Sequence, residues 1–112
     1  MKDILGTAKL DEEYYGRDNF GYVIATKILV ENNMPVLYAY REIARNHQDS
    51  GWRFFSGSES QAYIDDPENS GIYYATTILD IDDSIRSILN TPAPCAFKRE
   101  TFDGEFRVWE AF

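Results

Sequence analysis

Cysteine and histidine are almost absent from this sequence, which contains one of each, Cys95 and His47. A single cysteine cannot form an internal disulfide, and one cysteine with one histidine cannot supply the roughly four ligands of a zinc site. A Cys–His or Ser–His catalytic pair would need His47 close in space to its partner. His47 lies between Asn46 and Gln48, in a polar segment that predicts an exposed loop. We therefore expect no catalytic residue, no metal and no cofactor, and predict a protein that is not an enzyme.

Long apolar runs are also missing. No stretch approaches the roughly 20 apolar residues that span a bilayer, and residues 1–10 lack the pattern of a signal peptide. These features predict a cytoplasmic protein that has no membrane partner.

Basic residues are scarce: 11 Lys and Arg stand against 19 Asp and Glu, which gives a net charge of −8. Nucleic-acid binding depends largely on Lys and Arg that neutralise phosphates, so this balance disfavours a nucleic-acid partner. The same charge would favour a basic protein partner, or would simply keep a small protein soluble. The acidic clusters at residues 65–69 and 80–83 lack the glycine and glutamate of a calcium-binding EF-hand loop.

Apolar and aromatic residues are plentiful. They make up 44% and 15% of 112 residues, which predicts one folded domain with a real core. We expect residues 1–19 to form an N-terminal arm or short helix, and residues 20–112 to form the domain.

Local patterns within the domain predict both strands and helices. Two strand-like runs, residues 21–30 and 36–42, flank the turn cluster "ENNMP" and predict a β-hairpin. Residues 52–56 predict a third strand, and residues 95–100 and 105–110 a second hairpin around the Asp-Gly of "TFDG". The segment 72–79 fits either a strand or a helix.

Two helices are predicted from capping and periodicity. Ser58 and Gln61 fit a capping box that would begin a helix over residues 59–64. Apolar residues recur at helical spacing from Ile78 to Leu89, with Asp82 or Asp83 as a candidate cap. The fold class is therefore α+β: a single domain with a mostly antiparallel sheet of about five strands and two or three short helices.

The stretch "DSGWRFFSG", residues 49–57, is the most distinctive part of the chain. One interpretation is a core strand in which Trp52 and Phe54 face inward and Arg53 forms a salt bridge. The other is a partner-binding patch, since Trp, Tyr and Arg are the residue types that anchor interfaces. The candidates for this patch are Asp49, Trp52, Arg53, Tyr63, Asp65 and Asp66.

The order of "DSGWRFFSG", "YIDDPENSGIY", "TIL" and "AFKRE" resembles the immunity protein 33 family, also described as domain of unknown function 2185. The resemblance extends over roughly residues 20–107. It implies a non-enzymatic bacterial protein that binds a cognate toxin and blocks it. The alternative is a regulatory domain that binds a small molecule or peptide in a pocket beside Trp52 and Tyr63.

Overall fold

The structure is a computed structural model that describes residues 20–109, so the expected arm at residues 1–19 lies outside it. The element bounds, in chain order, are β1 (Tyr22–Thr26), α2 (Lys27–Glu31), β2 (Tyr38–Arg41), β3 (Asp49–Phe55), α3 (Gln61–Asp65), the 3-10 helix η1 (Pro67–Asn69), β4 (Ser70–Tyr73), α4 (Ala75–Ile81), the 3-10 helix η2 (Asp83–Ser87), β5 (Cys95–Lys98) and β6 (Arg107–Val108).

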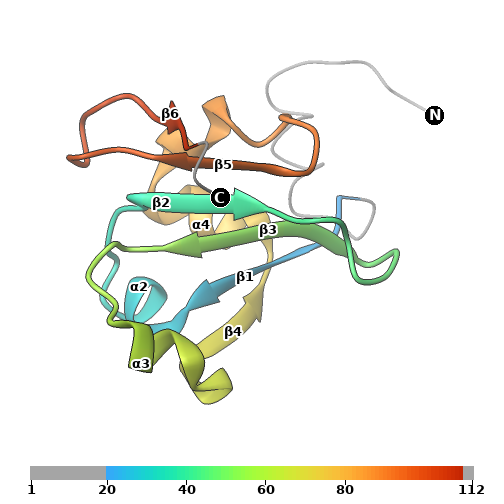
Figure 1. The fold of residues 1–112 in the computed structure, drawn as a ribbon, viewed down its shortest axis with the longest axis horizontal. Helices are drawn as coiled ribbons and strands as arrows, with labels where there is room; N and C mark the ends of the chain where they lie inside the picture. The colour runs from blue at the N-terminus through green and yellow to red at the C-terminus, as the bar shows by residue number, and fades with distance from the viewer. Residues whose placement is uncertain (1–19, 110–112) are drawn as a thin grey trace.

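The strands form one mixed sheet in the order β4-β1-β3-β2-β5-β6 (Figure 1). β1 runs parallel to β3, and the other four pairs are antiparallel. The predicted α+β class is confirmed, with six strands in place of about five. The hairpin at the C-terminal end is confirmed as β5 and β6, where Phe97 lies opposite Val108.

The predicted hairpin between residues 21–30 and 36–42 is wrong, because β3 lies between β1 and β2. The first run also ends as a strand at Thr26 and continues as α2, which buries Leu29. Every residue of β3 is buried, including the consecutive Trp52, Arg53, Phe54 and Phe55. A strand with bulky residues on both faces is stabilised most at the centre of a sheet, where neighbours cover both of its sides.

The main core lies between one face of the sheet and the layer formed by α2, α4 and η2. Strand alternation directs Trp52 and Phe54 into this core, where both are fully buried. From the helical layer Leu29, Ile78 and Ile85 are also fully buried. In Figure 1 the strands cross the view in front of α4. The inward-facing interpretation of Trp52 and Phe54 is therefore confirmed.

The helix expected to follow a cap at Asp82 or Asp83 and to end near Asn90 forms as the short 3-10 helix η2, which ends at Ser87. The cap at Asp82 is confirmed, because its carboxylate accepts a hydrogen bond from the Ser84 N–H. α4 ends at Ile81, and Asp82 adopts an extended conformation before η2. The Asp82 carboxylate accepts hydrogen bonds from the backbone N–H of Val36 at 2.9 Å and from Arg99 Nη2 at 2.6 Å. These two hydrogen bonds to other elements hold Asp82 in its extended conformation between α4 and η2. Ile78, Ile85 and Leu89 on either side of it reach the core. The segment 72–79 is first strand and then helix.

The helix over residues 59–64 is displaced to α3, and its N-cap is Ser60 rather than Ser58. The Ser60 hydroxyl accepts a hydrogen bond from the Tyr63 N–H at 3.1 Å. Glu59 instead accepts hydrogen bonds from the backbone N–H groups of Ser56 and Gly57, at 2.8 and 2.9 Å. This carboxylate closes the turn after β3. The turn places α3 beside the second face of the sheet, which is the face opposite the main core.

Candidate functional site

Arg53 lies at the centre of a buried ion-pair network. Its Nη1 and Nη2 donate to the two Asp49 carboxylate oxygens at 2.9 and 2.8 Å, and its Nε donates to Glu42 Oε2 at 2.6 Å. Arg53 and Asp49 are 2% and 5% exposed. The prediction that Arg53 forms a salt bridge is confirmed, and the network joins β3 to the end of β2.

The Asp49 carboxylate also accepts the backbone N–H groups of Arg45 and Gly51, at 3.0 and 2.8 Å. Burial by itself would raise the pKa of Asp49. The hydrogen bonds from Arg53, Arg45 and Gly51 outweigh burial and lower this pKa to about 2. Asp49 is therefore ionised at neutral pH, and it holds the loop before β3 against the strand.

Trp52 projects from the opposite side of β3. Its Nε1–H donates to the Leu89 carbonyl at 3.1 Å, and its ring stacks on Phe54 with centroids 5.7 Å apart. Trp52 has no exposed surface, and it lines neither the groove nor the cavity described below. A ring without exposed surface cannot line an open pocket. The regulatory alternative requires a pocket beside Trp52 and Tyr63, and Trp52 cannot contribute to it.

The other predicted residues lie on α3 and just after it. Tyr63 is half-buried, and its hydroxyl accepts a hydrogen bond from the Ile28 N–H at 3.1 Å. Asp65 and Asp66 are exposed. Asp66 caps η1 through the Glu68 N–H, and Asp65 accepts a hydrogen bond from Gln61.

The six predicted residues therefore do not share one patch. Asp49 and Arg53 pair with each other, Trp52 points into the core, and the α3 residues form a separate edge. Partner binding by these six residues stays a prediction.

The second face of the sheet carries a cluster of aromatic rings that the sequence reading did not select. Phe55 stacks on Tyr38 and on Tyr40, with centroids 5.1 and 5.8 Å apart. Trp109 meets Tyr38 edge-on at 4.9 Å, and Lys98 Nζ lies 5.3 Å from the Trp109 ring centroid. Burial raises the pKa of the Tyr38 and Tyr40 hydroxyls, so both stay neutral. Alternation along β2 and β3 was the signal that could have found this cluster.

Two adjoining cavities cross this face, and they share Phe55 and Ile64. The first, about 400 Å³, is lined by Ile24, Tyr40, Arg45, Arg53, Phe55, Ile64, Pro67, Ser70 and Ile72. The second, about 390 Å³, is lined by Tyr38, Phe55, Ile64, Lys98 and Trp109 among others. We call the two together the open-face groove. Arg53 lies at its floor, with its charge already paired to Asp49 and Glu42.

Acidic side chains border one end of the open-face groove. Asp65, Asp66 and Glu68 are exposed on α3 and η1, next to the groove residues Ile64 and Pro67. Within residues 20–109 none of these three acids forms an ion pair. We call Asp65, Asp66 and Glu68 the acidic rim.

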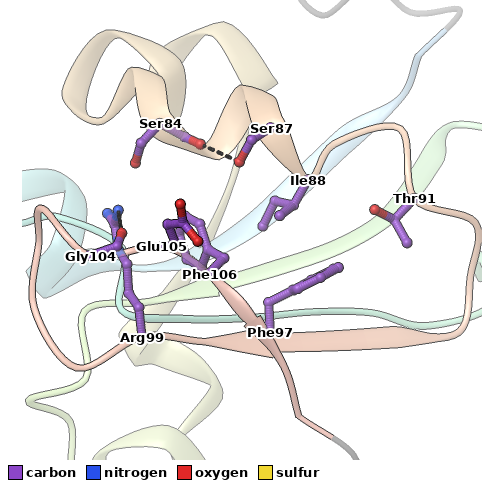
Figure 2. Close-up of a pocket in the computed structure, with 9 residues that line it drawn as sticks. All are labelled: Ser84, Ser87, Ile88, Thr91, Phe97, Arg99, Gly104, Glu105 and Phe106. Carbon is purple, nitrogen blue, oxygen red and sulfur yellow. Dashed lines mark hydrogen bonds between the residues drawn. The ribbon is translucent and has the colours of Figure 1, made fainter.

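A third cavity, about 540 Å³, lies on the helix side of the molecule, between η2 and the β5–β6 loop (Figure 2). Ser84 and Ser87 project from η2, and Phe97 and Arg99 from β5 and its end. Ser84, Ser87 and Arg99 already have hydrogen-bond partners. Ser87 donates to the Ser84 carbonyl at 2.9 Å, and Arg99 donates to the carbonyls of Val36 and Gly104 as well as to Asp82.

The groups expected to be inert lie apart from the open-face groove. His47 is exposed, as predicted. Cys95 is partly buried against the core, and burial raises the pKa of its thiol. Between residues 20 and 109 no three His, Cys, Asp or Glu side chains are grouped as metal ligands would be. No helix in this range is both long and apolar enough to cross a bilayer.

Comparison with known proteins gives one match. The model of the immunity protein Imm33 domain matches residues 23–110, a span that runs from the second residue of β1 past the end of β6. No curated protein and no solved structure matches the chain. The match covers most of the chain and confirms the resemblance carried by "DSGWRFFSG" and the segments after it. The chain belongs to the Imm33 immunity protein domain family.

Proposed function

We propose that this protein binds a cognate protein toxin and blocks it. The observation that carries the proposal is the family match over residues 23–110, which includes nearly all of the sheet and the helices packed on it. An immunity protein protects a cell by occupying its toxin, so the function requires a stable binding surface.

Steric occlusion is the mechanism that this chain supports best. The sheet is held by a buried ion-pair network and by a core centred on Trp52, so its surfaces are preorganised and little ordering is needed on binding. A stable complex should bury at least about 1,000 Å² in total. Because the charge of −8 favours encounter with a basic partner, we propose a basic toxin. We also propose that the protein acts in the bacterial cytoplasm.

Co-expression tests the proposal directly. The toxin domain encoded beside this gene is expressed in a sensitive bacterium, with and without this protein. Growth should be restored only when both are present, and the two proteins should co-purify as a stoichiometric complex. In a purified assay, toxin activity should fall to zero as this protein reaches a molar ratio of one. A toxin that stays fully active in molar excess of this protein would refute the proposal.

A further inference from the structure

We infer that the toxin docks on the open sheet face, with an apolar side chain in the open-face groove and basic side chains against the acidic rim. This inference rests on the proposed function and adds the interface and the chemistry of the partner. It commits to the toxin as the occupant of the groove.

The apolar character of the face is the first argument. The outer face of an antiparallel sheet normally carries polar side chains toward water. Here Ile24, Tyr40 and Phe55 line the groove, and Ile72 beside them is 67% exposed. A contiguous apolar surface of this kind, edged by charged residues, marks an interaction site.

The rings are also held in place before any partner arrives. Phe55 is 9% exposed and is stacked between Tyr38 and Tyr40, and Trp109 closes the cluster at its far side. Tyrosine and tryptophan supply large contact areas with few rotatable bonds, so a preformed cluster loses little entropy on binding. Such rings are the residue types that dominate interface energies.

Charge decides which partner fits. Residues 54–85 contain no Lys, Arg or His, so no positive charge from this segment offsets the acidic rim. The guanidinium of Arg53 is paired to Asp49 and Glu42, and Lys98 lies at the opposite end of the groove over Trp109. Arg45 also lines the first cavity and lies 3.8 Å from Glu42. The acidic rim thus presents three exposed carboxylates beside α3, and these would orient a basic partner. A second copy of the chain also carries −8, so charge disfavours the pairing of two open faces.

The experiment compares matched variants by their Kd for the toxin domain encoded beside this gene. Ile72→Arg changes the groove, and Phe102→Arg is its control, since Phe102 is 68% exposed on the β5–β6 loop. Ile72→Arg should raise Kd by about 30-fold, the scale of an interface hot spot. Phe102→Arg should leave Kd within about twofold.

A second pair tests the charge. Glu68→Lys reverses one charge of the acidic rim, and Glu105→Lys reverses an exposed charge at the helix-side cavity. Glu68→Lys should slow association by about tenfold at low salt and by less at high salt. Glu105→Lys should not change the rate. Circular dichroism confirms folding of each variant, and if Ile72→Arg does not fold, Ile72→Ser replaces it.

The outcomes separate the two proposals. If the wild-type protein does not bind or inhibit the toxin, the proposed function fails. If it inhibits the toxin but Phe102→Arg or Glu105→Lys weakens binding while the groove and rim variants do not, only the docking face is wrong. If the free protein sediments as a dimer that Ile72→Arg dissociates, the occupant is a second copy and the inference is overturned.

Discussion

Replacing Asp49 by asparagine should destabilise the protein at neutral pH, and this loss should shrink in acid. The asparagine would keep the shape of the side chain but would lose the charge that faces Arg53 at 2.8 and 2.9 Å. Arg53 is 2% exposed, so its guanidinium would keep only Glu42 as a charged partner. Removing one partner of a buried pair costs about 3 kcal/mol.

The sign of the pH dependence follows from the lowered pKa of Asp49. The ordinary value is 3.8 and the folded value is about 2, so the unfolded chain binds this proton more tightly. Asp49 therefore stabilises the fold fully above pH ~4, and this contribution disappears as the pH falls through 3.8 toward 2. At about 1.36 kcal/mol per pH unit, the part of the stability that is lost amounts to about 2 kcal/mol. The difference between wild type and Asp49→Asn should shrink by that amount.

The assay is urea unfolding followed by tryptophan fluorescence, because Trp52 is fully buried in the folded state. Free energies of unfolding are measured from about pH 7 down to about pH 2 for wild type, Asp49→Asn and the exposed control Asp65→Asn. The control should match wild type within about 0.5 kcal/mol at every pH. A difference between wild type and Asp49→Asn that stays constant over this range would refute the reasoning, since it would mean that the folded pKa is not lowered.

Two further substitutions test how β3 is held. Gly51 has φ of +90°, and an added Cβ would lie 2.2 Å from the Glu42 carbonyl oxygen. Gly51→Ala should therefore cost at least about 3 kcal/mol in urea unfolding, whereas Gly104→Ala in the β5–β6 loop should cost less than about 1 kcal/mol. Trp52→Phe removes the hydrogen bond to Leu89 and leaves a void, so thermal unfolding should show a loss of about 2 kcal/mol. A Trp52→Phe protein as stable as wild type would contradict the core assignment.

The elements that the sequence predicted well are those whose local pattern agrees with their final surroundings. Strand β3 and the β5–β6 hairpin carry strong local signals, and both form. The partner of β1 was predicted wrongly because hairpin logic favours neighbours in sequence. Strand order depends instead on which strand is buried most by neighbouring strands. That strand is β3, which lies between β1 and β2.

The helix predicted between a cap at Asp82 or Asp83 and Asn90 has the predicted cap, but it is a shorter 3-10 helix, η2. Its apolar residues were identified correctly as core, since spacing determines which side chains reach the interior. The break at Asp82 depends on Val36 and Arg99, which lie 46 and 17 residues away. Local sequence therefore predicted the cap at Asp82, but it does not encode these hydrogen bonds to distant residues.

The candidate site was missed for a related reason. Trp52 and Arg53 attract attention because they combine rare residue types, but the centre of a sheet buries both of them. Tyr38 and Tyr40 are ordinary strand residues by sequence. They became candidates only when the topology placed β2 beside β3, so that their rings share a face with Phe55.

The separation between buried residues of β3 and exposed residues of the groove and rim determines how the protein would distinguish one toxin from another. Asp49, Trp52 and Arg53 have almost no exposed surface, so a bound partner cannot contact them without rearranging the sheet. They act on binding by fixing the geometry of β3, and substitutions there should change stability and affinity together. Exposed side chains such as Ile72 in the open-face groove and Glu68 in the acidic rim bury little surface in the fold, so their substitution should change affinity while stability stays nearly constant. The choice of toxin should therefore depend on the groove and the rim, and the distinctive "DSGWRFFSG" stretch should serve as their foundation.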